Sequence, residues 1–214
     1  YSFVSMIKHM YLKISAVIIA LSVSSSVLAQ ESDSISYKEN KEKAIKLAVN
    51  KNVNQALPLL TSCYHENNND KEVQTMISAS LISLVSDKNN LQNSLDSIDA
   101  WTEKFPFLKD DKEVRKVYTI NANQLAFLSF QEKNIEKSLA YHDLVIEELA
   151  KNQGLGLKDN KDLISMAVNL ASDQLEKKEF RMARKIASSS LAYFDDPELK
   201  KMLKYMDDKQ LGLN

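Results

Sequence analysis

The pattern of apolar and polar positions in residues 121–150 is that of two amphipathic helices joined by a short polar turn at residues 132–134. In each half, apolar or small residues recur three or four positions apart, which places them on one face of a helix. The positions expected on these faces are Leu125, Leu128 and Ser129 in the first helix and Leu139, His142, Val145 and Ile146 in the second. Because a lone helical hairpin leaves its apolar faces partly open, it needs neighbouring helices to cover them.

Helical segments separated by polar turns continue along the chain and predict an all-α protein. Asp70 and either Asp110 or Asp111 stand where helix N-caps are expected, Pro106 ends one segment and Pro197 opens another. No stretch has the sustained period-two pattern of a strand. The helices are predicted at residues 37–50, 53–65, 71–85, 91–104, from the cap at 110 or 111 to 131, 135–152, 162–177, 180–194 and 199–209.

Four of the predicted helix pairs can be aligned on a small residue early in the second helix. A small residue is needed where two helices cross closely. The aligned residues, separated by 38, 44 and 45 positions, are Ala56, Ser94, Ser138 and Ala183. The positions four later are Leu60, Ile98, His142 and Ala187, those seven later are Cys63, Trp101, Val145 and Ser190, and those four earlier are Asn52, Asn90, Asn134 and Glu179. The alignment predicts one helical hairpin repeated four times.

This arrangement resembles the tetratricopeptide repeat (TPR), a helix pair with small residues at the helix crossings and a proline at the end of the unit. The matching residues are Leu125, Ala126, Ser138 and Tyr141 in the third unit, Leu170, Ala171, Phe180, Ala183 and Leu191 in the fourth, and Pro106 in the second. The resemblance covers residues 37–194. It implies a right-handed α-α superhelix of about four TPR-like hairpins, with a C-terminal capping helix.

The units depart from the family pattern in three respects. None has a glycine in its first helix or in its turn, and the spacing exceeds the family's usual length of about 34 residues. Trp101 occupies a position that is normally small, which indicates altered packing there. The units are therefore degenerate, and an ordinary helical bundle is the alternative architecture.

The resemblance also implies a place for a binding site. Solenoids of this kind bind partners on the concave surface lined by the first helix of each unit. The residues implied to face inward are Asn123, Phe127 and Phe130 in the third unit and Val168, Ser172 and Leu175 in the fourth. Two phenylalanines one turn apart are suited to anchor an apolar side chain of a peptide, although they also suit a helical core. The family's paired Lys and Asn clamp for a carboxylate is not reproduced, because Asn123 stands alone.

The first 29 residues have the pattern of a signal peptide. Lys8 and Lys13 precede an apolar run at residues 14–21, and small residues lead to a cleavage site between Ala29 and Gln30. Residues 1–5, which precede the first Met, are interpreted as an upstream extension. Residues 30–36 are then a polar linker and residues 37–209 the repeat domain. Because the apolar run is shorter than the roughly 20 residues of a membrane span, no stable span is expected after cleavage. The processed protein would be periplasmic or secreted, with an uncleaved N-terminal anchor as the alternative.

Composition and charge narrow the classes of partner. The chain of 214 residues has 28 Lys and Arg against 29 Asp and Glu, a net charge of −1, and the two signs are interspersed. No basic segment stands out, so no nucleic-acid partner is expected. Only three Gly and three Pro are present, which favours long helices with short connections. The lone Cys63 cannot form an internal disulfide and is predicted to pack as a small buried hydrophobe, with intermolecular pairing as the alternative.

No motif supports catalysis or metal binding, so the chain is predicted not to be an enzyme and to hold no cofactor or metal. His65 and His142 lack partners at metal-ligand spacing. Gly154 and Gly156 follow a helix rather than a strand, unlike a nucleotide-binding loop. A calcium loop beginning at Asp87 would lack its glycine and its bidentate acid.

These observations favour an exported, non-enzymatic helical-repeat scaffold of a bacterial cell envelope that binds a protein or peptide partner. The alternative is a TPR-like module or fragment of an envelope export apparatus, such as one that secretes exopolysaccharide. An envelope enzyme is the third hypothesis, and it lacks a catalytic constellation.

Overall fold

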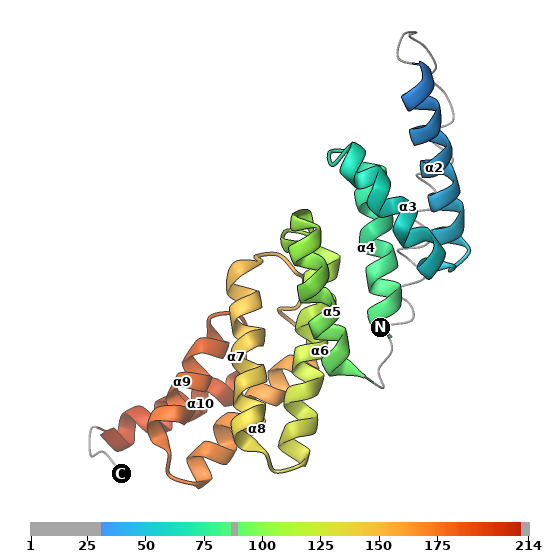
Figure 1. Cartoon of the computed structure of the whole chain (residues 1–214). Helices are drawn as coiled ribbons and strands as arrows, with labels where there is room; N and C mark the ends of the chain where they lie inside the picture. The colour runs from blue at the N-terminus through green and yellow to red at the C-terminus, as the bar shows by residue number, and fades with distance from the viewer. Residues whose placement is uncertain (1–30, 87–89, 211–214) are drawn as a thin grey trace. The chain divides into compact units, whose positions relative to one another are not determined.

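The computed structural model describes residues 31–86 and 90–210, which form nine α-helices and one short 3₁₀-helix without a strand among them (Figure 1). The prediction of an all-α protein is confirmed. The elements are α2 Glu31–Val49, α3 Val53–Glu66, α4 Lys71–Val85, α5 Leu91–Lys104, η1 Pro106–Lys109, α6 Lys112–Gln131, α7 Ile135–Lys151, α8 Lys161–Glu176, α9 Phe180–Leu191 and α10 Pro197–Gln210.

Two helix boundaries differ from the predicted ones by more than two residues. Helix α2 begins at Glu31, so the predicted linker is helical from that residue onward. The segment is polar but contains no Gly or Pro, and polarity alone does not prevent a helix. Helix α9 ends at Leu191, and the amides of Tyr193 and Phe194 turn back to donate to the carbonyl oxygen of Ser190. The predicted turn at residues 87–90 lies outside the described residues except for Asn90.

The chain divides into two units, residues 1–39 and 40–214, with the boundary inside α2. In the first unit, described residues 31–39 are all helical. The second unit contains the remainder of α2 and helices α3 to α10, and the contacts that follow lie within it.

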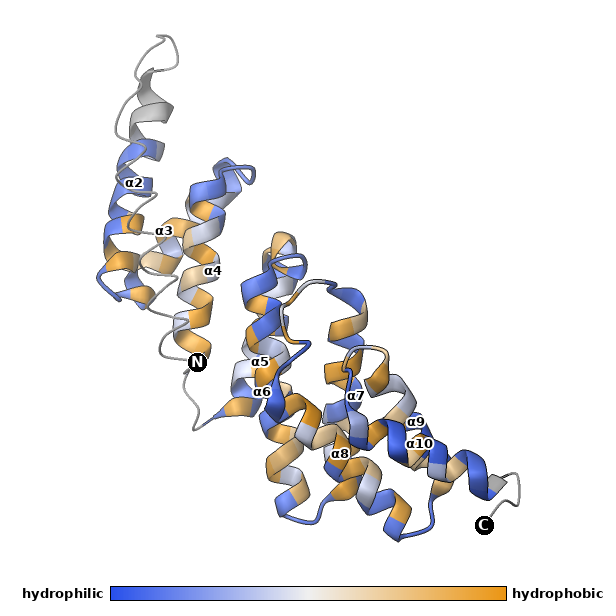
Figure 2. Ribbon diagram, turned by 180° about the vertical axis from the view of Figure 1, so that it is seen from behind, coloured by the Kyte–Doolittle hydropathy of each residue, from blue (hydrophilic) through white to orange (hydrophobic). Residues whose placement is uncertain are grey.

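Within the second unit, helices close in sequence pack against one another. Each helix from α3 to α9 packs against the next one in the chain, and α4 packs against α6, α6 against α8, and α8 against α10. The core lies between these helices. In Figure 2 most connections are blue and the orange residues lie along the helices, as expected where apolar side chains are buried between neighbouring helices.

Aspartates cap the helices where the sequence predicts them. The Asp70 carboxylate accepts hydrogen bonds from the amides of Glu72 and Val73, which begins α4. Asp111 rather than Asp110 caps α6, and its second carboxylate oxygen accepts a 2.5 Å hydrogen bond from the Ser78 hydroxyl of α4. The cap of α6 therefore also links two neighbouring first helices.

Three hairpins close with the same turn. Lys51, Lys133 and Lys178 each follow a first helix with φ of 60–62°, the left-handed region that L-residues rarely adopt. In each turn the amide of the next residue bonds back to the carbonyl five positions earlier, at 2.8–2.9 Å, and the lysine amide bonds three positions back, at 3.0 Å. These paired bonds are those of a Schellman motif. The same local structure is thus built three times.

The buried face of the central hairpin agrees with the predicted one at Ser129, His142 and Val145 but not at Leu128. Leu128 is 45% exposed, whereas Ala122, Ala126 and Ser129 of α6 are buried. The Ser138 hydroxyl of α7 donates to the carbonyl oxygen of Ala126 at 2.7 Å, so the two helices meet at their smallest side chains. Leucines on that face would hold α6 and α7 further apart.

A pair of small residues at the same spacing recurs in two other hairpins. The small residues are paired twelve positions apart, and all of them are fully buried. The pairs are Ala44 and Ala56, Ala126 and Ser138, and Ala171 and Ala183. The prediction that aligned small residues mark helix crossings agrees with this burial.

A polar cluster joins α5, α6 and α7 and is buried at Arg115, Tyr118 and Glu148. The Arg115 guanidinium donates to both carboxylate oxygens of Glu148, at 2.8 and 2.5 Å, and packs 4.4 Å from the centre of the Tyr118 ring. Asn152 donates a further bond to Glu148, and the Tyr118 hydroxyl donates to Asp99 at 3.4 Å. Burial raises the pKa of Tyr118 to about 12 and also raises the pKa of Asp99.

Candidate partner-binding groove

A groove of about 590 Å³ lies between the first helices of two successive hairpins, α6 and α8. One wall comes from the end of α6 and the start of α7, and the other comes from α8. The residues that line it are Phe127, Phe130, Gln131, Lys133, Ile135, Asn169, Asp173 and Lys177. A volume of this size accommodates several residues of a peptide or a small molecule.

The apolar part of the groove is built from α6. Phe127 and Phe130 are three positions apart, so they share one side of the helix. Phe127 is 44% exposed and Phe130 is half-buried. Phe127 is therefore not a core residue, and a large aromatic side chain left open to solvent beside a groove is typical of a binding surface.

The turn after α6 positions Lys133 at one end of the groove. Its left-handed backbone reverses the chain so that α7 begins at Ile135, whose side chain also lines the groove. Lys133 is exposed, and among the described residues its ammonium has no hydrogen bond or ion pair. The same turn thus supplies one apolar and one cationic group.

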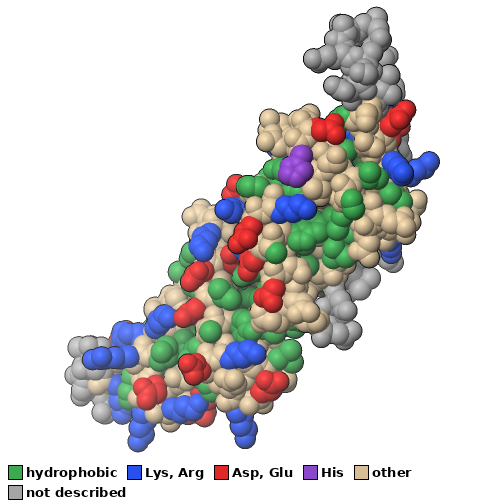
Figure 3. Space-filling view, in the orientation of Figure 1, with side chains coloured by type: hydrophobic (Ala, Val, Ile, Leu, Met, Phe, Trp, Pro, Cys, Tyr) green, Lys and Arg blue, Asp and Glu red, His purple; other side chains and the backbone are tan. Residues whose placement is uncertain are grey.

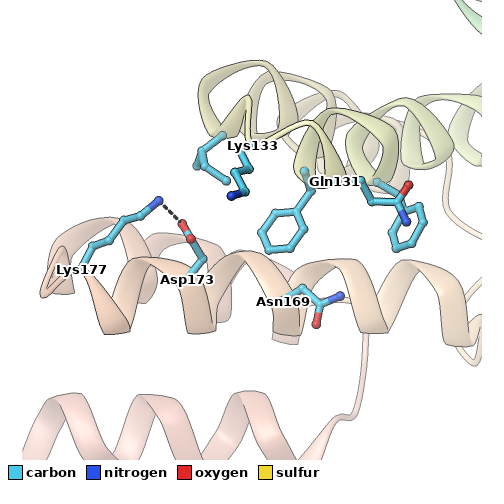
Figure 4. A pocket seen from close by; sticks show the side chains of 8 residues that line it. Gln131, Lys133, Asn169, Asp173 and Lys177 are labelled. Carbon is cyan, nitrogen blue, oxygen red and sulfur yellow. Dashed lines mark hydrogen bonds and ion pairs between the residues drawn. The ribbon is translucent and has the colours of Figure 1, made fainter.

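Helix α8 supplies the polar wall. Asp173 accepts from Lys177 at 2.8 Å and from the Gln174 amide at 2.8 Å. Figure 4 shows Lys133, Asp173 and Lys177 toward one end of the groove, with the side-chain amides of Gln131 and Asn169 toward the other. The groove therefore combines two aromatic side chains with a charged end and an amide end.

The structure brings two of the six implied inward-facing residues into this groove, namely Phe127 and Phe130. Asn123 is only 4% exposed and does not line the groove, and its Oδ1 has no hydrogen-bond partner among the described residues. On α8, Val168, Ser172 and Leu175 are half-buried. The α8 residues that do line the groove lie one or two positions further on. Successive residues point about 100° apart on a helix of 3.6 residues per turn, so that offset changes the face presented to α6.

The predicted cleavage site, Ala29 and Gln30, lies outside the described residues, as does the rest of the predicted signal peptide. Within the described part of the chain, no helix has the length and apolarity needed to cross a membrane.

A second, smaller hollow of about 390 Å³ lies between α3 and α5. Trp101, the unusually large residue at a position expected to be small, is half-buried and lines it together with Leu57 and Pro58. The indole ring lies 5.6 Å from the ring of Phe105, centre to centre. Trp101 therefore extends an aromatic cluster at the end of α5 rather than a close helix crossing.

The Cys63 thiol and the His142 imidazole are buried at separate places in the protein. Burial raises the pKa of the Cys63 thiol, which keeps it protonated at neutral pH. His142 is 1% exposed, and burial lowers its pKa to about 4. Among residues 31–86 and 90–210, no three His, Cys, Asp or Glu side chains are grouped so that they could hold a metal ion.

The surface charge is mixed on the face drawn in Figure 3, where Lys and Arg side chains alternate with Asp and Glu. Comparison of the chain with models of known protein families, with curated proteins and with solved structures finds no match.

Proposed function

We propose that the chain is a TPR-like helical-repeat scaffold, exported to the bacterial cell envelope, that binds a protein or peptide partner in the groove between α6 and α8. The observation that carries the binding proposal is the pair Phe127 and Phe130, held at the groove while much of Phe127 is open to solvent.

Three features support the repeat architecture. From α4 onward, α4, α6, α8 and α10 pack against one another in succession, while α5, α7 and α9 each pack against the helix before and the helix after. The same lysine turn closes three hairpins, and the same pair of small residues is buried in all three. A right-handed superhelix of such hairpins, capped by α10, accounts for all three features.

The groove suits a peptide for a physical reason. An aromatic surface gains free energy by covering a partner's apolar side chain, and the flanking amides and charges fix the direction of the segment. Its position between two first helices is where a solenoid of this type leaves its inner wall free. The proposal of export rests on the signal-peptide pattern of residues 1–29, with a periplasmic or secreted product.

Site-specific photo-crosslinking tests the binding proposal. A benzophenone amino acid is placed at Phe127 in the full chain, expressed in the organism that encodes it. The control position is Met182 of α9, which has a comparable exposed fraction and does not line the groove. We expect a discrete crosslinked protein from position 127 that the control does not give.

Binding of the crosslinked partner should also depend on the groove. The double variant Phe127→Ala with Phe130→Ala is expected to lose the partner in a binding assay with the purified protein, while Leu128→Ala, an equally exposed neighbour, retains it. Unchanged binding by the double variant, or equal crosslinking from both positions, would contradict the proposed site. Circular dichroism of each variant confirms that it is folded.

N-terminal sequencing of the protein recovered from the envelope fraction tests export. We expect a chain that begins at Gln30. Recovery of the full-length chain from the cytoplasm would contradict the export proposal without affecting the groove.

A further inference from the structure

Only some of the charged side chains along the groove between α6 and α8 have an ion-pair partner. Two lysines and one aspartate line it. The carboxylate of Asp173 is already engaged by Lys177 and by the Gln174 amide. Lys133 has no such partner among the described residues, and the acidic neighbours Glu132 and Glu136 do not line the groove. One positive charge is therefore available to an occupant of the groove.

The apolar surface lies next to this charge. Phe130 precedes Lys133 by three residues, a rise of about 4.5 Å along a helix. An extended peptide advances about 3.3 Å per residue. A segment that places a large apolar side chain against Phe127 and Phe130 can therefore bring a carboxylate near Lys133 one or two residues later.

The polar groups at the amide end of the groove suit a bound peptide whose backbone continues in that direction. Gln131 and Asn169 each offer an amide donor and an amide acceptor at the groove. Such groups pair with the N–H and C=O of an extended backbone, which has both along its whole length. This favours an internal segment of a partner over a chain terminus.

On the basis of the function proposed above, we propose that the groove selects an extended internal segment with a large apolar side chain followed, within about two residues, by an Asp or Glu side chain. The apolar side chain covers Phe127 and Phe130, and the carboxylate pairs with Lys133. Selectivity for acidic over basic segments comes from Lys133, because Asp173 and Lys177 neutralise each other.

Fluorescence anisotropy with three synthetic peptides tests the proposal on the full chain. The peptides are fluorescein-labelled at the N-terminus and amidated at the C-terminus, so that any carboxylate belongs to a side chain. The first contains Phe-Gly-Glu within a Gly-Ser segment, the second Phe-Gly-Lys and the third Ala-Gly-Glu. We expect the first to bind roughly tenfold more tightly than either of the others, with a difference from the second that shrinks as salt is added.

The chain offers a matched control for the charge. Lys133 and Lys178 hold the same left-handed position in equivalent turns, with φ of 60° and 62°, and Lys178 does not line the groove. Lys133→Glu is expected to reverse the preference in favour of the Lys peptide. Lys178→Glu is expected to leave the preference unchanged at the same cost in backbone strain.

The outcomes separate the inference from the proposed function. Equal affinity for the Glu and Lys peptides, or reversal by Lys178→Glu as well, overturns the acidic selectivity while the groove stands. Binding only by a version of the Phe peptide with a free C-terminus overturns the internal-segment assignment. If no Phe peptide binds and the Phe127 crosslink also fails, the proposed function falls with the inference.

Discussion

His142 lies in α7 with its Nε2 atom 3.3 Å from the Ser190 hydroxyl of α9, and its Nδ1 has no partner among the described residues. Burial is the main cause of its low pKa, and the neighbouring Lys185 lowers the pKa further while Asp143 partly opposes the shift. The aligned residues in the other three hairpins, Leu60, Ile98 and Ala187, are apolar and fully buried. A neutral imidazole thus occupies a position that the fold otherwise fills with hydrocarbon.

We expect His142 to make stability depend on pH. Its pKa falls from 6.5 in the unfolded chain to about 4 in the folded protein. Between these values the unfolded chain binds a proton that the folded protein does not, so stability is full above pH 6.5 and falls as pH drops toward 4. The expected loss is about 3 kcal/mol.

Urea unfolding of the wild type and of His142→Leu at several pH values between 7.5 and 4 measures this dependence. The variant is expected to lack that part of the slope, with a pH-independent cost of about 1 kcal/mol from the hydroxyl left behind on Ser190. His65→Leu, at an exposed position, serves as the control and should keep the wild-type slope. Parallel slopes for all three proteins would contradict the assignment.

The ion pair between Arg115 and Glu148 gives a second prediction at this scale. Glu148→Gln leaves the Arg115 charge buried and unpaired, so we expect a loss of about 3–5 kcal/mol in the free energy of unfolding. The adjacent Glu147 pairs with Lys151 on the exposed side of the same helix, and Glu147→Gln should change stability by less than about 0.5 kcal/mol.

Replacing both partners separates burial of charge from loss of contact. The double variant Arg115→Met with Glu148→Leu is expected to recover most of the stability lost by Glu148→Gln, because no charge then remains buried. Chemical denaturation of the four proteins gives the comparison. A double variant less stable than Glu148→Gln would show that the pair stabilises the fold beyond its own charges.

At the scale of elements, the repeated turn gives the clearest prediction. Its lysines adopt a left-handed conformation that glycine tolerates better by about 1 kcal/mol. We expect Lys178→Gly to stabilise the protein by about 0.5–1 kcal/mol in chemical denaturation, because its φ of 62° becomes unstrained. Lys51→Gly should do the same, since the turn is equivalent.

The neighbouring residue is the control for this turn. Lys177 has φ of −77° in the right-handed region and pairs with Asp173. Lys177→Gly is expected to lower stability, because glycine gains nothing there and adds freedom to the unfolded chain. A loss from both substitutions would mean that the left-handed turn carries no strain that glycine relieves.

Most helix boundaries could be predicted from the sequence because their causes are local. Asp70, Asp111 and Pro106 act on residues within one turn of themselves. The buried faces were harder to predict, because a periodic pattern does not say which neighbour covers each side. Leu128 fits the pattern and is exposed, whereas the smaller Ala126 lies at the crossing.

For the same reason, only the α6 wall of the candidate groove could be predicted from the sequence. Phe127 and Phe130 were found because the TPR resemblance assigns one side of α6 to the inner surface. The α8 wall depends on how α8 rotates against α6, which is a long-range property. Lys133 was missed because glycine is the usual residue at this position of such a turn, so no pattern indicated a lysine with φ of 60° at a groove.

At the scale of the whole molecule, the pattern of packing decides how a local change spreads. Helices that contact their neighbours in sequence form an approximately linear array, in which stability is a sum of unit and interface terms. In a closed bundle, each helix shares one core and unfolding is more nearly all-or-none. The proposed superhelix and the alternative bundle therefore respond differently to damage at one end.

Leu170→Ala is the change that distinguishes them. Leu170 is fully buried in α8, which packs against α6, α7, α9 and α10. The cavity should cost about 2–5 kcal/mol. In a linear array, native-state hydrogen exchange read by mass spectrometry should show protection lost in α8–α10, partly lost in α6–α7 and unchanged in α3–α4. Ile77→Ala, a fully buried position in α4, should give the mirror pattern. Uniform loss of protection in both variants would favour the closed bundle and remove the free inner wall on which the binding proposal depends.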